Sequence, residues 1–144
     1  MLENSRRQNL LFLLAFGLAL AVRLLRLGEI PLSDDEARWA MQAFDLTKGL
    51  RPTLGPQPAY VLLTALLFYA LQAGNFVARL VPALAGSALV LTPLFFRDRL
   101  GTKPALVLAF VLALEPGLLA LSRQAGSPIL ALCAVLFAWG LWRT

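Results

Sequence analysis

Long apolar segments alternate with short polar ones along this chain of 144 residues. Residues 9–27, 80–96, 104–121 and 129–142 are almost entirely apolar. A helix rises about 1.5 Å per residue, so the longer segments reach across a hydrocarbon core of about 30 Å. The pattern predicts an all-α integral membrane protein with about four transmembrane helices.

A further apolar segment, 59–73, is flanked by Pro58 on one side and Gly74-Asn75 on the other. As a straight helix it would reach only about 22 Å, so it is either a mismatched span or a helix at the membrane surface. Before it lies a stretch rich in Gly and Pro that predicts a loop with one short helix at about 34–48. The whole chain, 1–144, is therefore predicted to be a single membrane module.

Composition supports the membrane interpretation. The chain is 59% hydrophobic and 15% charged, its mean hydropathy is +0.73, and a soluble domain has about 25% charged residues. The net charge is +5, but the basic residues flank apolar segments, which indicates contact with lipid headgroups rather than nucleic acid. The chain has no histidine and one cysteine, Cys133, which excludes an intrachain disulfide. No metal ligand is assigned, and a divalent cation held by oxygen ligands is the only cofactor considered.

The distribution of basic residues predicts the orientation in the membrane. Arg6 and Arg7 precede the first segment, which places the N-terminus in the cytoplasm, and the basic turn at 97–103 should lie on the same side. Segments 9–27 and 80–96 then supply the two crossings between these sites, so 59–73 should not cross. This gives a multi-pass protein of the inner (plasma) membrane, with an external loop over 28–79 and Arg143 in the cytoplasm.

Two alternatives fit the same pattern. Five crossings would place the basic turn outside. The first segment could instead be a cleaved signal peptide, although Arg23 and Arg26 continue the same helical run, which argues against it.

The stretch "SDDE" at 33–36 stands out in so apolar a chain. Ser33 with Glu36 fits a capping box, and acids in a first helical turn favour the positive end of the helix dipole, so all three acids are explained without function. The functional interpretation is compatible with this, because a helix N-terminus favours the charged form of Asp35, as a general base requires. Arg38 lies within helical reach for an ion pair with Asp35.

Five more charged residues in or beside the apolar segments have two interpretations each. Arg23, Arg26, Arg79 and Arg123 all fall on the external side of the four-crossing topology. Arg79 and Arg123 either extend to lipid headgroups or bind a substrate phosphate, whereas extension to headgroups is favoured for Arg23 and Arg26. Glu115 lies inside an apolar run. It is either functional or explained without function: it lies near the outer end, pairs with Arg23 or Arg26, or is protonated.

The order of these features resembles the N-terminal part of membrane glycosyltransferases of the GT-C fold. The residues that carry the resemblance are "RLLRLGEIPLSDDEARWA", then "GLRPTLGPQPAYVLLTALLFYALQAGN", then the spans from "ARLVPALAG" to "LLALSR", and "QAGSPILAL". The bacterial relatives of protein O-mannosyltransferases and the aminoarabinose transferase of lipid A are the most similar members (family 39-like). The resemblance implies transfer of a sugar from a polyprenyl-phosphate carrier to an acceptor at the external membrane face.

The resemblance also implies site residues. The family's Asp-Glu pair at the start of an external surface helix aligns on Asp35 and Glu36, with Asp35 deprotonating or positioning the acceptor, and the family's arginine before the second span falls on Arg79. Many relatives carry a second Asp where this chain has Ser127. A hydroxyl cannot supply that negative charge, so a metal or acceptor function at this position would be lost or moved.

Family members run to several hundred residues, so the resemblance covers only their N-terminal part. Three interpretations follow: part of a full transferase, half of a split enzyme that needs a second membrane subunit, or a non-catalytic subunit that assembles a larger complex. The partners expected are the bilayer, a polyprenyl-phosphate sugar and a second subunit, without nucleic acid.

Overall fold

The computed structural model describes residues 2–53 and 55–142, with side chains from residue 6 onward. All regular structure in this part of the chain is helical, which confirms the predicted all-α class. Arg143, which the sequence places in the cytoplasm, lies outside the described residues. The helices are α1 Leu2–Leu24, α2 Asp34–Thr47, α3 Pro58–Leu71, α4 Asn75–Ala88, η1 Leu89–Phe96, α5 Arg97–Leu100, α6 Thr102–Leu114, α7 Pro116–Ser122 and α8 Ile129–Trp142.

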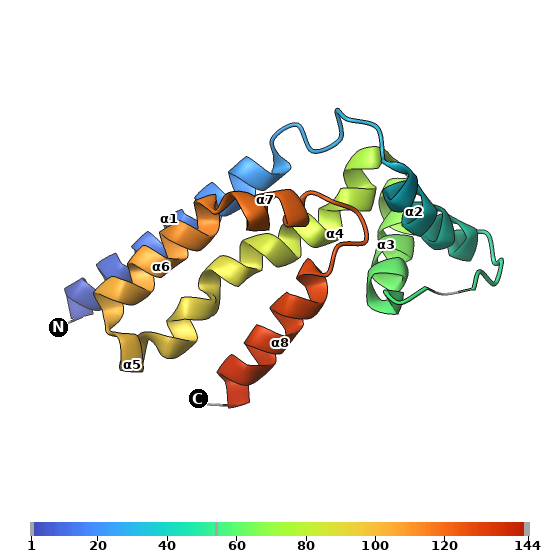
Figure 1. Ribbon diagram of the computed structural model, residues 1–144. Helices are drawn as coiled ribbons and strands as arrows, with labels where there is room; N and C mark the ends of the chain where they lie inside the picture. The colour runs from blue at the N-terminus through green and yellow to red at the C-terminus, as the bar shows by residue number, and fades with distance from the viewer. Residues whose placement is uncertain (1, 54, 143–144) are drawn as a thin grey trace.

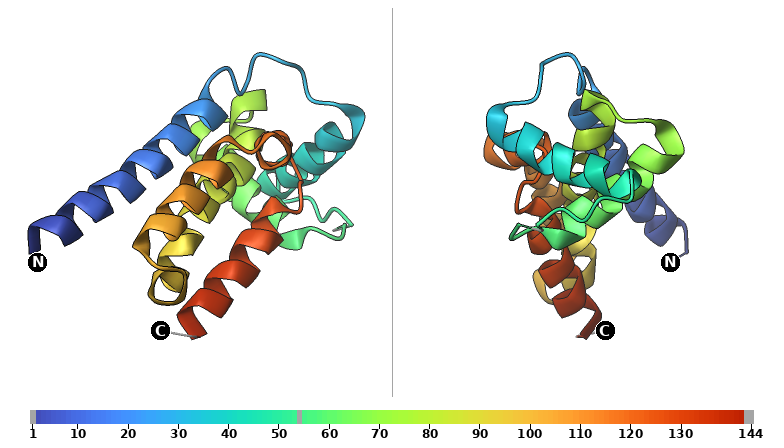
Figure 2. Two further views of the ribbon diagram at one scale, coloured as in Figure 1. Left: turned by 60° about the vertical axis from the view of Figure 1, so that its left-hand side comes forward. Right: turned by 90° about the vertical axis from the view of Figure 1, so that its right-hand side faces the viewer.

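The helices form a bundle with a hairpin at one end (Figure 1). Helix α4 contacts α1, α3, α7 and α8 and so lies at the centre. Helix α6 packs against α1 and against η1, which continues α4. Helices α2 and α3 pack against each other and extend from the end that also holds the α7–α8 turn, while α5 and both termini lie towards the opposite end (Figures 1 and 2). Helices therefore occur at Asp34–Thr47 and Pro58–Leu71, where the sequence predicted 34–48 and 59–73.

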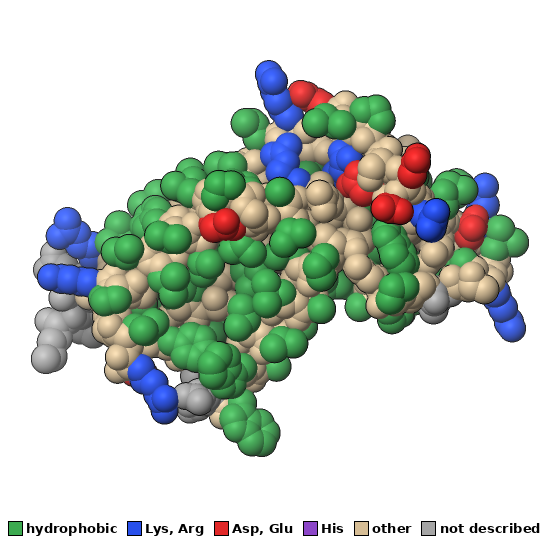
Figure 3. Space-filling view, in the orientation of Figure 1, with side chains coloured by type: hydrophobic (Ala, Val, Ile, Leu, Met, Phe, Trp, Pro, Cys, Tyr) green, Lys and Arg blue, Asp and Glu red, His purple; other side chains and the backbone are tan. Residues whose placement is uncertain are grey.

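Two helical stretches in the described residues are long and apolar enough to cross a membrane, Arg6–Leu24 and Asn75–Leu100. A third is present if α6 and α7, which meet at a bend of 56°, are taken as one broken span. Helices α3 and α8 are apolar but have 14 residues each, or about 21 Å. Apolar side chains cover much of the surface shown in Figure 3, as expected for helices that face lipid.

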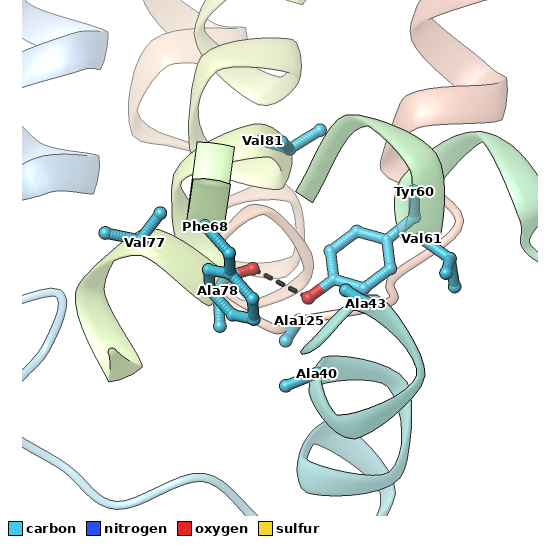
Figure 4. Packing of buried hydrophobic residues seen from close by; sticks show 9 residues of the cluster. All are labelled: Ala40, Ala43, Tyr60, Val61, Phe68, Val77, Ala78, Val81 and Ala125. Carbon is cyan, nitrogen blue, oxygen red and sulfur yellow. Dashed lines mark hydrogen bonds between the residues drawn. The ribbon is translucent and has the colours of Figure 1, made fainter. Parts of the chain in front are cut away.

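Small residues let α1 and α6 approach closely. Ala105, Ala109 and Ala113 repeat every fourth position of α6 and are fully buried, together with Ala15 and Ala19 of α1. This spacing puts each set on one face of its helix, where the absence of larger side chains allows close backbone contact. A second cluster joins α2, α3 and α4 around Tyr60, Val61 and Phe68 (Figure 4).

Proline positions are compensated by side chains. The predicted span 80–96 would put Pro82 in its first turn, where proline is tolerated, but α4 begins at Asn75, so Pro82 lies inside the helix. Proline has no N–H, which leaves the Ala78 carbonyl without its helical donor. The Tyr60 hydroxyl of α3 donates to that oxygen at 2.8 Å (Figure 4), and this hydrogen bond connects α3 to α4 at the proline.

Candidate functional site

The first turn of α2 carries the acidic cluster that the sequence singles out. The Ser33 hydroxyl accepts from the Glu36 backbone N–H at 3.5 Å, and the Ser33 N–H donates to Glu36 Oε2 at 3.0 Å. The predicted capping box is therefore confirmed. It fixes the start of α2, and with it the positions of Asp34 and Asp35.

Glu36 turns inward and forms a buried ion pair with Arg79 of α4. Arg79 Nε donates to Glu36 Oε1 and Arg79 Nη2 donates to Oε2, both at 2.8 Å. The Ala125 backbone N–H also donates to Glu36 Oε1 at 2.8 Å. Four donors thus surround the two carboxylate oxygens, and the pair joins α2, α4 and the α7–α8 turn.

The remaining N–H groups of Arg79 are also used within the protein. Nη1 donates to the carbonyls of Leu27 and Ile30 at 3.1 and 2.7 Å, and Nη2 donates to the Pro31 carbonyl at 3.1 Å. These three carbonyls belong to the connection between α1 and α2. With the two bonds to Glu36, all five guanidinium N–H groups have acceptors. The sequence prediction gave Arg79 a phosphate, but in this arrangement it has no N–H left for one.

The environment of Glu36 strongly favours its charged form. Burial by itself raises the pKa of a carboxyl, but here the hydrogen bonds from Arg79, Ser33 and Ala125 outweigh it and lower the pKa to about 2. A group held charged and enclosed in this way is a poor proton acceptor at neutral pH. The structure therefore gives Glu36 the geometry of a positioning residue, while the catalytic role predicted for it stays a prediction.

Asp35 has the opposite environment. Its side chain is exposed, and it makes no hydrogen bond or ion pair with any described residue, including Arg38, whose pairing the helical spacing had suggested. It lies next to Glu36, whose carboxylate contacts the α7–α8 turn. Asp35 is thus an accessible carboxylate on a helix whose start is fixed by buried bonds, and a proton could be transferred to it.

The α7–α8 turn carries the other two positions singled out by sequence. Arg123 is half-buried; its Nη1 donates to the Val22 carbonyl at 2.9 Å and its Nη2 to the Arg26 carbonyl at 3.4 Å. Arg123, which the sequence predicted to bind a phosphate, is thus hydrogen-bonded to backbone carbonyls at the end of α1. Ser127 is buried, and its hydroxyl has no hydrogen-bond partner among the described residues.

Trp39 of α2 packs on this turn at Gly126. A Cβ on Gly126 would lie 2.3 Å from the Trp39 ring, and the residue has a φ of +72°. Both the close contact and the left-handed backbone require glycine here. The contact fixes the turn against α2 one helical turn beyond Asp35.

Arg23 was expected to extend to lipid headgroups, and the structure corrects this. Its side chain is fully buried. It donates to the carbonyls of Leu112 and Ala113 at 3.3 and 3.1 Å, and to Ser122 Oγ at 3.0 Å. Pro116 has no N–H to offer the Leu112 carbonyl, so Arg23 supplies the donor that the bend between α6 and α7 removes.

Glu115 forms the other half of this bend. Its side chain accepts from the backbone N–H groups of Gly117 and Leu118 and so caps the start of α7. No ion pair joins Glu115 to Arg23 or Arg26 within the described part of the chain, so the pairing that was one of the alternatives for Glu115 is not formed. Its position in an apolar run follows from its role as a helix cap.

The described residues include no group of three or more Asp, Glu, Cys or His side chains that could hold a metal ion. Position 127, where the resemblance suggested a second acid, is a serine.

Comparisons with protein-family models, curated proteins and solved structures found no match to this chain.

Proposed function

We propose that the chain is a GT-C-like glycosyltransferase module that acts at the external membrane face on a polyprenyl-phosphate sugar. The observation that carries the proposal is the contrast between adjacent acids: Asp35 is exposed and unpaired among the described residues, while Glu36 is buried and fixes the helix that presents it. Catalysis by a general base requires an accessible carboxylate in a fixed position, and this arrangement supplies both.

In the proposed reaction, Asp35 accepts the proton of an acceptor hydroxyl or amine. The acceptor oxygen or nitrogen forms a bond to the anomeric carbon of the sugar, and the bond from that carbon to the phosphate oxygen breaks. The polyprenyl phosphate leaves with the bonding electron pair as an anion. No further oxidant or reductant is needed, and the proton ends on Asp35 before it passes to solvent.

We further propose four membrane crossings, by α1, by α4 with η1, by α6 with α7, and by α8, with a cytoplasmic N-terminus in the plasma membrane. Alternation of these helices puts Arg6, Arg7, Arg97, Arg99 and Lys103 at one end of the bundle and α2, α3 and the α7–α8 turn at the other (Figures 1 and 3). The basic N-terminus and the basic turn at 97–103 agree with the positive-inside rule. Basic residues are also present on the proposed external side, where Arg23, Arg79 and Arg123 donate to groups of this chain.

A second candidate is a non-catalytic membrane subunit that assembles a larger complex. The observation that favours it is the state of the two arginines predicted to bind phosphate: Arg79 donates all its N–H groups to this chain, and Arg123 is attached to the end of α1. A transferase must then bind the carrier phosphate through other groups. For the transferase, a second membrane subunit would supply such groups.

The experiment compares Asp35→Asn with Asp34→Asn, because both acids are exposed in the first turn of α2 and only Asp35 has the proposed role. Native membranes that contain the chain and its co-purifying partners are supplied with radiolabelled polyprenyl-phosphate mannose or polyprenyl-phosphate aminoarabinose. We expect transfer that Asp34→Asn leaves within about twofold and Asp35→Asn reduces by a factor of about 100 or more, the range of general-base catalysis.

Two outcomes would contradict the transferase. One is equal transfer by the two variants. The other is no transfer above membranes without the chain, together with stoichiometric association with an unrelated complex, which would support the subunit instead.

A further inference from the structure

A groove lies between the N-terminal half of α1 and the end of η1. It has a volume of about 530 Å³ and is lined from α1 by Asn9, Phe12 and Leu13, and from η1 and the start of α5 by Leu91, Leu94 and Arg97. The N-terminal end of α1 and α5 lie at the same end of the bundle, away from α2 and the α7–α8 turn (Figures 1 and 2). The groove is therefore separate from the site described above.

The helical periods explain why these residues form two walls. The three residues of α1 are three and four positions apart, so they share one face of that helix. η1 is a 3₁₀-helix, in which residues three apart eclipse one another, so Leu91, Leu94 and Arg97 form one row. The Asn9 amide and the Arg97 guanidinium thus stand at the outer ends of two apolar rows, both towards the end of the bundle that holds α5.

The donors of these two polar side chains are not used by the protein. The Arg97 side chain is 50% exposed, and its closest acidic group is Asp98 Oδ1, 3.8 Å from Nε, which is too long for a hydrogen bond. Asp98 itself is 94% exposed, and surface pairs of this kind contribute little. Neither Arg97 nor Asn9 donates a hydrogen bond to any described residue. The buried arginines at the opposite end of the bundle, in contrast, donate to backbone carbonyls of the chain.

This end of the bundle is also strongly basic. Four further basic side chains are exposed in the same two stretches of sequence, Arg6, Arg7, Arg99 and Lys103, and Asp98 is the one acid within 6–13 and 97–103. A groove with apolar walls and a basic end is complementary to an anion that carries a hydrocarbon chain, since a free anion would leave the walls in contact with water. Basic pockets between transmembrane helices on the cytoplasmic side bind the headgroups of anionic lipids.

We propose that this groove is a binding site for one anionic phospholipid of the cytoplasmic leaflet. Its phosphate accepts hydrogen bonds from the Arg97 guanidinium and the Asn9 amide, and one acyl chain lies between Leu13 and Leu94. The inference rests on the proposed membrane crossings by α1 and by α4 with η1, but not on sugar transfer, because it uses none of the residues proposed for that reaction. The bound lipid joins the first two spans at the end opposite to the pair of Glu36 and Arg79.

The probe is phosphatidylglycerol, titrated into the delipidated chain in maltoside micelles and followed as lipid adducts by native mass spectrometry. Phosphatidylcholine with the same acyl chains and glycerol 3-phosphate are titrated in parallel. We expect one saturable phosphatidylglycerol adduct per chain, with the other two at least about tenfold weaker. The reason is that phosphatidylcholine has no net negative charge and glycerol 3-phosphate has no acyl chain.

Two matched pairs of variants locate the site. Arg97→Gln should weaken binding about tenfold, whereas Arg99→Gln, at an exposed position outside the lining, should stay within about threefold. Leu13→Trp should fill the groove and weaken binding about tenfold, whereas Leu14→Trp, outside the lining, should stay within about threefold. Leu13 and Leu14 are 61% and 63% exposed, so the lipid-free melting temperature should not change in either variant.

Equal losses from Arg97→Gln and Arg99→Gln would show general attraction to a basic surface and would overturn the site. Equal binding of phosphatidylcholine or of glycerol 3-phosphate would overturn its assignment to an anionic lipid. A chain that carbonate extracts from membranes would refute the crossings on which the site rests, whereas an inserted chain without saturable binding would refute the site alone. Phosphatidylglycerol binding at Arg97 without any sugar transfer would support the site and count against the proposed reaction.

Discussion

The buried pair of Glu36 and Arg79 predicts a large loss of stability on a small chemical change, Glu36→Gln. Glutamine has the same size and retains the capping-box acceptor for the Ser33 N–H. It loses the negative charge opposite Arg79, whose side chain is only 8% exposed. It also loses the oxygen that accepts from Arg79 Nε and the Ala125 N–H, because an amide NH₂ takes its place. The variant therefore separates these contacts from the cap.

The magnitude follows from the pKa of Glu36. The ordinary value is 4.5 and the folded value is about 2. At about 1.4 kcal/mol per pH unit, this difference corresponds to about 3 kcal/mol of stability at neutral pH. Removal of one partner of a buried pair generally costs about 3–5 kcal/mol, which agrees.

The pH dependence has a definite sign. Because the folded pKa lies below the unfolded one, the stabilisation is fully present above pH 4.5 and is lost as the pH falls towards 2. The free energy of unfolding of the wild type should therefore fall by about 3 kcal/mol between pH 4.5 and pH 2. Glu36→Gln should lose much less there, because the group that titrates is gone.

The assay is the free energy of unfolding in mixed micelles of maltoside and dodecyl sulfate, followed by helical circular dichroism at several pH values. Glu29→Gln is the matched control, since Glu29 pairs with Arg26 at the surface with 62% of its side chain exposed, and it should change stability by less than about 1 kcal/mol. If Glu36→Gln were as stable as Glu29→Gln at pH 7, or kept the full acid-dependent loss, the pair would not stabilise the fold as argued.

Three further changes test the joints between helices by the same unfolding assay. Tyr60→Phe should lower the free energy of unfolding by about 2 kcal/mol, because the Ala78 carbonyl loses its donor. Tyr69→Phe, at an 83% exposed position, should leave the free energy of unfolding unchanged. Gly86→Ala should lower the free energy of unfolding by about 1–3 kcal/mol, because the new Cβ would lie 2.3 Å from the Ser122 Cβ. Gly17→Ala, which has no atom within 4 Å of its new Cβ, should raise the free energy of unfolding by up to about 1 kcal/mol. Glu115→Ala should lower the melting temperature more than Glu115→Gln, which keeps a capping oxygen; equal values would exclude the cap.

Local patterns in the sequence were sufficient to predict the features that depend on neighbouring residues. The capping box joins Ser33 and Glu36, three positions apart, so it can be read from spacing alone. The positions of α2 and α3 followed from hydropathy and from the flanking prolines and glycines. A start at Asn75 for α4 was missed because Arg79 interrupts the apolar run, although residues 76–78 are already apolar and Gly74 precedes the helix.

Contacts between distant residues could not be predicted in this way. Glu36 and Arg79 are 43 positions apart in the sequence, and Arg23 donates to the carbonyl of Ala113, 90 positions away. Such pairs depend on how the helices pack, which hydropathy does not specify. One signal was available: a proline inside a helix marks the carbonyl four residues earlier as needing a donor, but not which side chain supplies it. Tyr60 and Arg23 fill that role at Pro82 and Pro116.

The two acids that the sequence treats as a pair have separate physical roles, and their variants should separate in experiment. Glu36 is enclosed by four donors, so its loss should reduce stability and, through displacement of α2, reduce any transfer activity. Asp35 is exposed, so Asp35→Asn should leave the free energy of unfolding within about 0.5 kcal/mol of wild type while it abolishes transfer. A Glu36→Gln protein that is stable but lacks transfer would indicate a direct role of Glu36 in the reaction. An Asp35→Asn protein that unfolds would indicate a structural role of Asp35. The measurement of stability and transfer on the same preparations therefore distinguishes a base from the residue that positions it.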